Sequence, residues 1–188
     1  MASTQVIGSG ETYTTFAAFE AASLSTDDWT AEIKGTVTET TGTFVNNTAF
    51  NNPLVIKENG SRHTGTAGSG ADKWVWNFSS GGVALDVSAN VNVTVQDLEI
   101  DFNGSNIKEG FASDNGETLT IERCIIHNIG ADRSGFVYAI GVVGGSASSF
   151  VARSNIIYDI HNDGNGDVYG KVQGGRRRSE DTCGRRCL

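Results

Sequence analysis

Three side chains that could take part in binding or catalysis stand at similar intervals in this 188-residue chain: a carboxylate, an imidazole and a phenol. Asp101, His127 and Tyr158 each follow a short apolar run, and Asp159 comes directly after the last of them. A carboxylate beside an imidazole can hold the ring in one tautomer for acid–base work, and a tyrosine ring can stack on a sugar. Both roles require the three runs to lie side by side, so the elements that carry the runs decide whether a site exists.

The runs are copies of one another. Residues 93–100, 119–126 and 150–157 align with offsets of 26 and 31. A preceding apolar segment also recurs, with Ala84, Ala112 and Ala139 aligned at offsets of 28 and 27, and a further copy begins near Gly166. A period of about 28 residues with short strands and no helix predicts a β-solenoid, in which each coil stacks on the next at about 4.8 Å.

The alternation of side chains predicts which residues face inward. The inward layers are Val93, Val95, Leu98 and Ile100; then Leu119, Ile121, Cys124 and Ile126; then Phe150, Ala152, Asn155 and Ile157. We expect the amide of Asn155 to bond the backbone of a neighbouring coil. The remaining residues of each copy point outward and form rows across the copies. The row of Asp101, His127 and Tyr158 is the best candidate site. An ordinary surface ladder of hydrogen bonds is the alternative interpretation.

The repeated frame apolar-x-apolar-(x)2-apolar-x-apolar resembles the right-handed parallel β-helix, or pectin-lyase-like, superfamily. The opening residues 10–18 and the segment 61–66 are similar to phage and bacterial β-helix repeat proteins. The resemblance implies an all-β fold, a right-handed parallel β-helix of about three to four coils with a short N-terminal capping helix. Within residues 13–22, Thr15 can cap that helix, and Phe16, Phe19 and Ala22 share a face.

The domain boundaries follow from these patterns. Residues 1–80 are predicted to form an N-terminal cap of a short helix plus β-strands, residues 81–172 the coils, and residues 173–188 a basic disordered tail. The fourth copy gives way to arginines without a capping element. Truncation of a longer protein, or a homotrimer that covers the open end, would each account for this ending.

In this superfamily the outer face of one parallel sheet usually binds long saccharides. The resemblance therefore makes Asp101, His127, Tyr158 and Asp159 glycan-binding candidates. The clustered aspartates beside an arginine of pectate lyases are not found, nor are the paired aspartates and Gly-His-Gly of polygalacturonases. We assign no catalytic residue and favour a non-catalytic module, part of a phage tail or spike or of a secreted surface protein that binds glycans. The alternative is a carbohydrate-active enzyme, either a polysaccharide lyase or a glycoside hydrolase.

No metal or cofactor is predicted. Residues 163–167 alternate oxygen ligands like the first half of an EF-hand loop, but Val168 and Gly174 stand where that loop needs glycine and glutamate. Adventitious binding of calcium is the one exception to this prediction. His63 and His161 are interpreted as loop histidines. Arg123 and Arg153 lie on the repeat frame, but no carboxylate cluster convincingly accompanies them.

Charge and hydropathy limit the partners. The formal net charge is −8; the segment after Gly175 carries +3, which leaves −11 on the rest. Such a body repels nucleic acid, and no apolar run is long enough to cross a bilayer. We expect a polysaccharide or surface glycan as partner, no nucleic acid and no membrane. No signal peptide is visible at the start, and an extracellular or virion-associated location is expected. Cys124 is predicted to be buried, whereas Cys183 and Cys187 make no disulfide framework.

Overall fold

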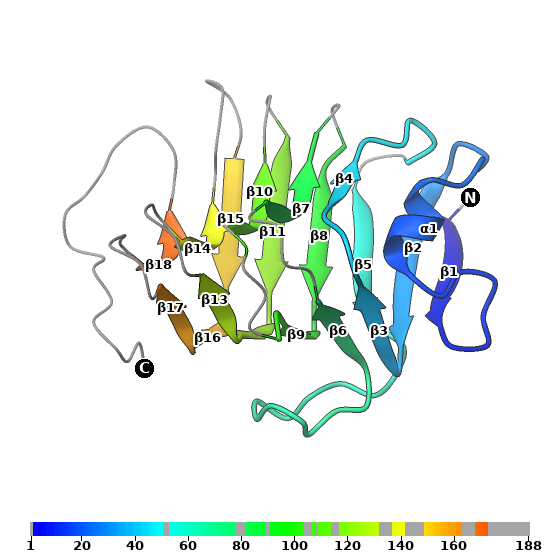
Figure 1. Cartoon of the computed structure of the whole chain (residues 1–188). Helices are drawn as coiled ribbons and strands as arrows, with labels where there is room; N and C mark the ends of the chain where they lie inside the picture. Colours follow the sequence, from blue (N-terminus) through cyan, green and yellow to red (C-terminus); the bar gives the residue numbers. More distant parts are fainter. Residues whose placement is uncertain are drawn as a thin grey trace.

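The computed structural model describes residues 2–50, 53–77, 82–88, 91–103, 107, 109–113, 117–131, 137–141, 149–162 and 168–172. Throughout this part of the chain the strands pair in parallel, and they form three main sheets beside one short helix (Figure 1). The fold class is therefore all-β, as the repeat predicted.

The chain visits the three sheets in turn. Sheet 1 contains, in spatial order, β1 (Ala2–Gly8), β2 (Asp28–Lys34), β5 (Leu54–Glu58), β8 (Val93–Gln96), β11 (Thr118–Glu122) and β15 (Ser149–Arg153). Sheet 2 contains β3 (Thr36–Glu39), β6 (Lys73–Trp76), β9 (Glu99–Asp101), β12 (Ile125–His127) and β16 (Ile156–Ile157). Sheet 3 contains β4 (Thr43–Val45), β7 (Val83–Val87), β10 (Glu109–Ser113), β14 (Val137–Gly141) and β18 (Val168–Val172). A short fourth sheet pairs β13 (Ile129–Ala131) with β17 (Ile160–Asn162).

One traversal of sheets 1, 2 and 3 is called a pass below. From β2 onward, each pass returns the chain to sheet 1 beside the strand of the previous pass (Figure 1). The strands β1 to β6 precede residue 80, yet they belong to the same three sheets as the later strands. The division into a cap and coils at that residue stays a prediction.

The register in sheets 1 and 2 is the one predicted from the repeats. Ile121 pairs with Val95 on one side and with Ala152 on the other. Ile126 likewise lies between Ile100 and Ile157. The inward layers of the first two copies are buried, so alternation assigned their faces correctly.

The alignment predicted in sheet 3 is wrong. Ala112 pairs with Asp86 rather than Ala84, and Phe111 pairs with Ile140, so that Ala112 does not lie opposite Ala139. Each predicted pairing is displaced by two residues. A slip of two residues leaves every side chain on the same face of the sheet, so the apolar pattern alone could not distinguish the two registers.

The helix closes the end of the molecule at which β1, β3 and β4 are edge strands (Figure 1). Helix α1 (Phe16–Glu20) is shorter than the predicted segment, but the Oγ1 atom of Thr15 accepts the Ala18 N–H at 3.2 Å as the expected cap. The Phe16 ring lies edge-on to Trp74, with centroids 5.4 Å apart. Glu39, which is buried, accepts the Phe16 N–H at 2.7 Å and the Trp74 indole N–H at 3.2 Å. These contacts fasten the helix to the interior of the sheets.

Several sequence predictions lie outside the described residues. They are the basic tail 173–188 with Cys183 and Cys187, and the EF-hand-like run 163–167. In the part of the chain that is described, no helix is long and apolar enough to cross a membrane.

Candidate functional site

The turn from sheet 1 to sheet 2 has a recurrent backbone conformation. Gly35, Asp97, Arg123 and Ser154 occupy this corner on different passes, with φ values of 64°, 60°, 54° and 54°. On the remaining pass, between β5 and β6, residues 59–72 replace the tight turn. This long loop is called the strap below.

Asp72 closes the base of the strap. Its carboxylate accepts backbone N–H groups from Gly35 at 2.7 Å, Asn59 at 3.0 Å and Ser61 at 2.9 Å. Because three donors surround one buried carboxylate, both ends of the strap are held to the neighbouring pass.

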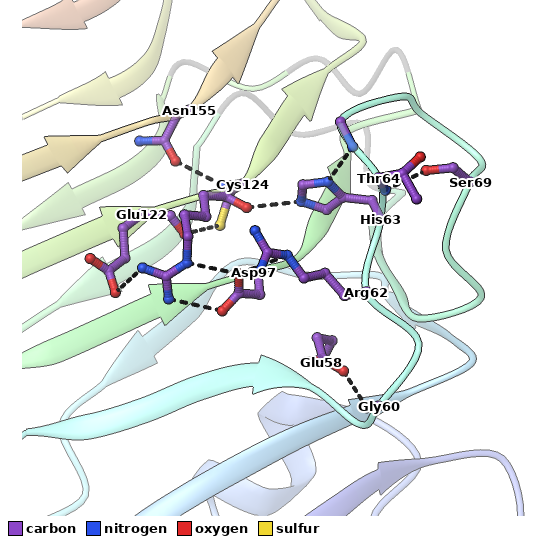
Figure 2. A network of polar contacts seen from close by, with 12 residues as sticks. Glu58, Gly60, Arg62, His63, Thr64, Ser69, Asp97, Glu122, Cys124 and Asn155 are labelled. Atoms are coloured by element: carbon purple, nitrogen blue, oxygen red, sulfur yellow. Dashed lines mark hydrogen bonds and ion pairs between the residues drawn. The ribbon is translucent and has the colours of Figure 1, made fainter.

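From this base the strap reaches over the two following passes (Figure 2). The Nε2 atom of His63 donates to the Arg123 carbonyl at 2.8 Å, and the Arg62 guanidinium lies 3.0 Å from the Asp97 carboxylate. Farther along, the Gly68 N–H donates to Glu99 at 2.6 Å. His63 is thus a loop residue as predicted, but it is a buried one that holds the loop in place. His161 lies in β17 with its side chain exposed, so its assignment to a loop was wrong.

Arg123 has the carboxylate partners that the sequence analysis did not find. Its Nε and one terminal nitrogen each donate to Asp97 at 2.9 Å, and its other terminal nitrogen lies 2.8 Å from Glu122. The hydrogen bonds from Arg123 hold the pKa of Asp97 below its ordinary value. The same contacts raise the pKa of Arg123. The pair therefore remains charged and acts as a fastening between successive corners.

The structure brings the predicted row together on the outward face of sheet 2. His127 pairs in register with Asp101, and the Tyr158 N–H donates to the carbonyl of Ile126 on the preceding pass. The rings of His127 and Tyr158 stack face to face, with centroids 5.1 Å apart and an interplanar angle of 1°. Tyr158 is half-buried and Asp159, at φ 52°, is exposed.

His127 faces a buried carboxylate that was not among the predicted site residues. Its Nε2 atom lies 3.2 Å from Glu99, whose other close partners are Lys73 Nζ at 2.8 Å and the Gly68 N–H. Only 1% of Glu99 and 5% of His127 are exposed. Burial would raise the pKa of Glu99, but the hydrogen bonds from Lys73 and Gly68 outweigh it and the pKa is lowered. The sequence did contain a signal that could have identified Glu99 as a site residue: it aligns with Ile125 and Ile156. A single charged side chain in an otherwise apolar row needs a partner.

Asp101 is also held in its ionised form. Its Oδ1 atom accepts the Asn128 amide at 2.9 Å and the Asn103 N–H at 2.8 Å, and Lys73 Nζ lies 3.6 Å from Oδ2. Burial opposes ionisation, yet these hydrogen bonds and the nearby charges lower the pKa of Asp101. Burial and the carboxylates of Glu99, Asp159 and Asp101 raise the pKa of Tyr158. The arrangement thus combines a rigid aromatic pair with ionised carboxylates.

Neither a metal site nor a reactive thiol is found among the described residues. Within the described residues, no cluster of three or more His, Cys, Asp or Glu side chains could hold a metal ion. The Cys124 thiol is buried, which raises its pKa to about 12 and suppresses the thiolate form.

Comparisons with known proteins leave the site to be interpreted from its own geometry. No family model matches the chain, and neither the curated proteins nor the solved structures contain a significant match.

Proposed function

We propose that the parallel sheets form a right-handed parallel β-helix of the pectin-lyase-like kind, in which α1 caps the first coil. The recurrent left-handed corners and the in-register inward layers support this fold. Asn155 supports it further: its Oδ1 atom accepts the Cys124 N–H at 2.9 Å and its Nδ2 atom donates to Ile121 at 2.8 Å. A side chain that bonds the backbone of the adjacent pass in this way is the asparagine bridge expected at a coil bend.

We further propose that the chain is a non-catalytic module that binds a glycan on the outward face of sheet 2. The observation that carries this proposal is the stack of Tyr158 on His127. A tyrosine ring held rigid by a second ring loses little conformational freedom when a sugar packs on it, and the neighbouring Asp159 can accept sugar hydroxyl groups. His127 is buried, so in this proposal it supports Tyr158 and does not touch the glycan.

The electrostatics favour binding over catalysis. A glycosidase needs a carboxylic acid whose pKa is raised so that it can protonate the leaving group. In Glu99 and Asp101 the pKa is lowered instead, and Glu99 is enclosed by Lys73, Gly68 and His127. The alternative, a polysaccharide lyase or glycoside hydrolase, is favoured by one observation, the contact between Glu99 and His127.

The setting of such a module is a phage tail or spike, or a secreted surface protein, with an extracellular or virion-associated location. A polysaccharide or surface glycan is the proposed partner, and assembly into a homotrimer is compatible with these settings. Neither nucleic acid nor a membrane is part of the proposal.

A glycan array combined with assays for new reducing ends and unsaturated products tests the function. We expect binding without product formation. We expect Tyr158→Ala to weaken binding by tenfold or more, roughly the effect of losing one stacked aromatic ring. Phe44→Ala is the matched control, because Phe44 is an exposed aromatic residue on sheet 3. Equal binding by both variants would contradict the site, and product formation abolished by His127→Ala would establish the enzyme alternative.

A further inference from the structure

The outward face of sheet 2 changes from covered to open between its last two strands. Ile125 and Ile156 are neighbours in register, yet Ile125 is 0% exposed and Ile156 is 44% exposed. Among the described residues, the contacts of the strap reach as far as Arg123 on the earlier pass. Ile156, Tyr158 and Asp159 therefore form an open step on the later pass, which is called the ledge below.

The ledge has an apolar part and a charged part. Ile156 and the Tyr158 ring offer a surface for the C–H face of a sugar. Beside them, Asp159 is exposed, and its carboxylate forms no ion pair with any described residue. The ledge can thus hold a sugar ring and present one free carboxylate to its substituents.

Carboxylates predominate among the described charges around the ledge. Lys73 is a cation of this face, and it is already shared between Glu99 at 2.8 Å and Asp101 at 3.6 Å. Burial is the largest cause of the raised pKa of Tyr158, and the nearby carboxylates of Glu99, Asp159 and Asp101 raise it further. Arg153, on the same pass, projects from sheet 1, where it pairs in register with Glu122. A sugar carboxylate would meet repulsion at the ledge, whereas a sugar ammonium would be attracted.

Resting on the proposed function, we propose that the ledge selects glycans that carry free amino groups over acetylated or uronic acid polymers. The ring of a glucosamine unit packs on Tyr158 and Ile156, and its ammonium group donates to the Asp159 carboxylate. Such a charge-assisted hydrogen bond is stronger than one to a neutral acetamide. At a partly exposed position it favours the amine by a modest factor, about fivefold.

The experiment compares oligosaccharides of equal length built from β-linked glucosamine, N-acetylglucosamine and glucuronic acid. Calorimetry at mildly acidic pH keeps the amine of the sugar protonated. We expect the order of affinity to be glucosamine, then N-acetylglucosamine, then glucuronic acid, with added salt reducing the preference. Asp159→Asn removes the preference for the amine and leaves the affinity for N-acetylglucosamine within about twofold. Asp28→Asn, which changes an exposed carboxylate at the start of β2, is the matched control and keeps the preference.

The outcomes separate this inference from the proposed function. If the neutral oligomer binds in a Tyr158-dependent way and the amine adds nothing, the glycan site stands and the selectivity is wrong. Tighter binding of glucuronic acid, or a preference for the amine that survives Asp159→Asn, would also overturn the selectivity. If Tyr158→Ala leaves the binding of every oligomer unchanged, the proposed glycan site itself is wrong.

Discussion

His63 donates a hydrogen bond of 2.8 Å to the carbonyl of Arg123, a residue 60 positions later in the chain. This bond joins the strap to a corner two passes away, and the side chain of the same Arg123 binds the Asp97 carboxylate. The strap therefore connects the corners of successive passes. We expect the removal of its contacts to lower the free energy of unfolding.

His63→Ala removes this bond and leaves the Arg123 carbonyl without its buried partner. We expect the free energy of unfolding to fall by about 1 kcal/mol and amide hydrogen exchange in residues 59–72 to accelerate. Urea unfolding and hydrogen exchange measure the two effects. His161→Ala is the control, because that side chain is exposed on β17. Equal stability of the two variants would show that the bond contributes nothing.

Asp97 makes the acid stability of the protein depend on Arg123. The pKa of Asp97 is lowered in the folded chain, from an ordinary value of 3.8, so its contribution is present above about pH 4 and is lost as the pH falls through the folded value. At neutral pH we expect Asp97→Asn to cost about 1 kcal/mol, and we expect the difference from the wild type to shrink below about pH 4. Urea unfolding at a series of pH values checks this, with Asp28→Asn as control. A difference that does not change with pH would contradict the ion pair.

Asn155 satisfies two backbone groups of the preceding pass, the Cys124 N–H and the Ile121 carbonyl. Asn155→Leu keeps a similar volume but leaves both groups without a partner. We expect a loss of about 1–3 kcal/mol in the free energy of unfolding, because an unpaired buried polar group costs its full desolvation. Arg153→Ala, at an exposed position on the same pass, should be nearly neutral in the same denaturation experiment. A loss as small as that of Arg153→Ala would mean that water replaces the amide.

Glu39 joins the helix to the sheets, and the burial of its charged carboxylate is unfavourable. Burial raises the pKa of Glu39 above its ordinary 4.5, against the opposing hydrogen bonds from Phe16 and Trp74. The folded chain therefore binds this proton more tightly, and the wild type gains stability as the pH falls through the folded value towards 4.5. Glu39→Gln keeps an oxygen acceptor without the charge, so it should lack this gain and be at least as stable as the wild type at neutral pH.

Thermal melts between neutral pH and about pH 4.5 measure the effect of Glu39. Glu39→Ala is the comparison variant: it leaves the Phe16 N–H and the Trp74 indole unpaired, and we expect it to lose about 1–3 kcal/mol at every pH. Identical pH profiles for the wild type and Glu39→Gln would contradict a buried, charged Glu39.

Much of the architecture could be predicted from the order of residues. Repetition with a side-chain alternation of two places Ile121 between Val95 and Ala152, and the same alignment brings His127 beside Asp101. Thr15 was predictable as a helix cap because it accepts an N–H three residues later. Asn155 was predictable as a bridge because the repeat places it beside the preceding pass. In sheet 3 the pattern failed by two residues, since either register buries the same face.

The strap and its contacts could be found only in the tertiary structure. Residues 59–72 have no copy elsewhere in the chain, so no periodicity indicates where the segment lies, and its contacts with Glu99 and Arg123 join residues far apart in sequence. The sequence by itself determined the parallel sheets and the outward row, because local alternation and repetition are enough to stack one pass on the next. The additional partners of Asp97 and Glu99, which are Arg62 and the Gly68 N–H, were decided by the path of a loop that follows no repeat.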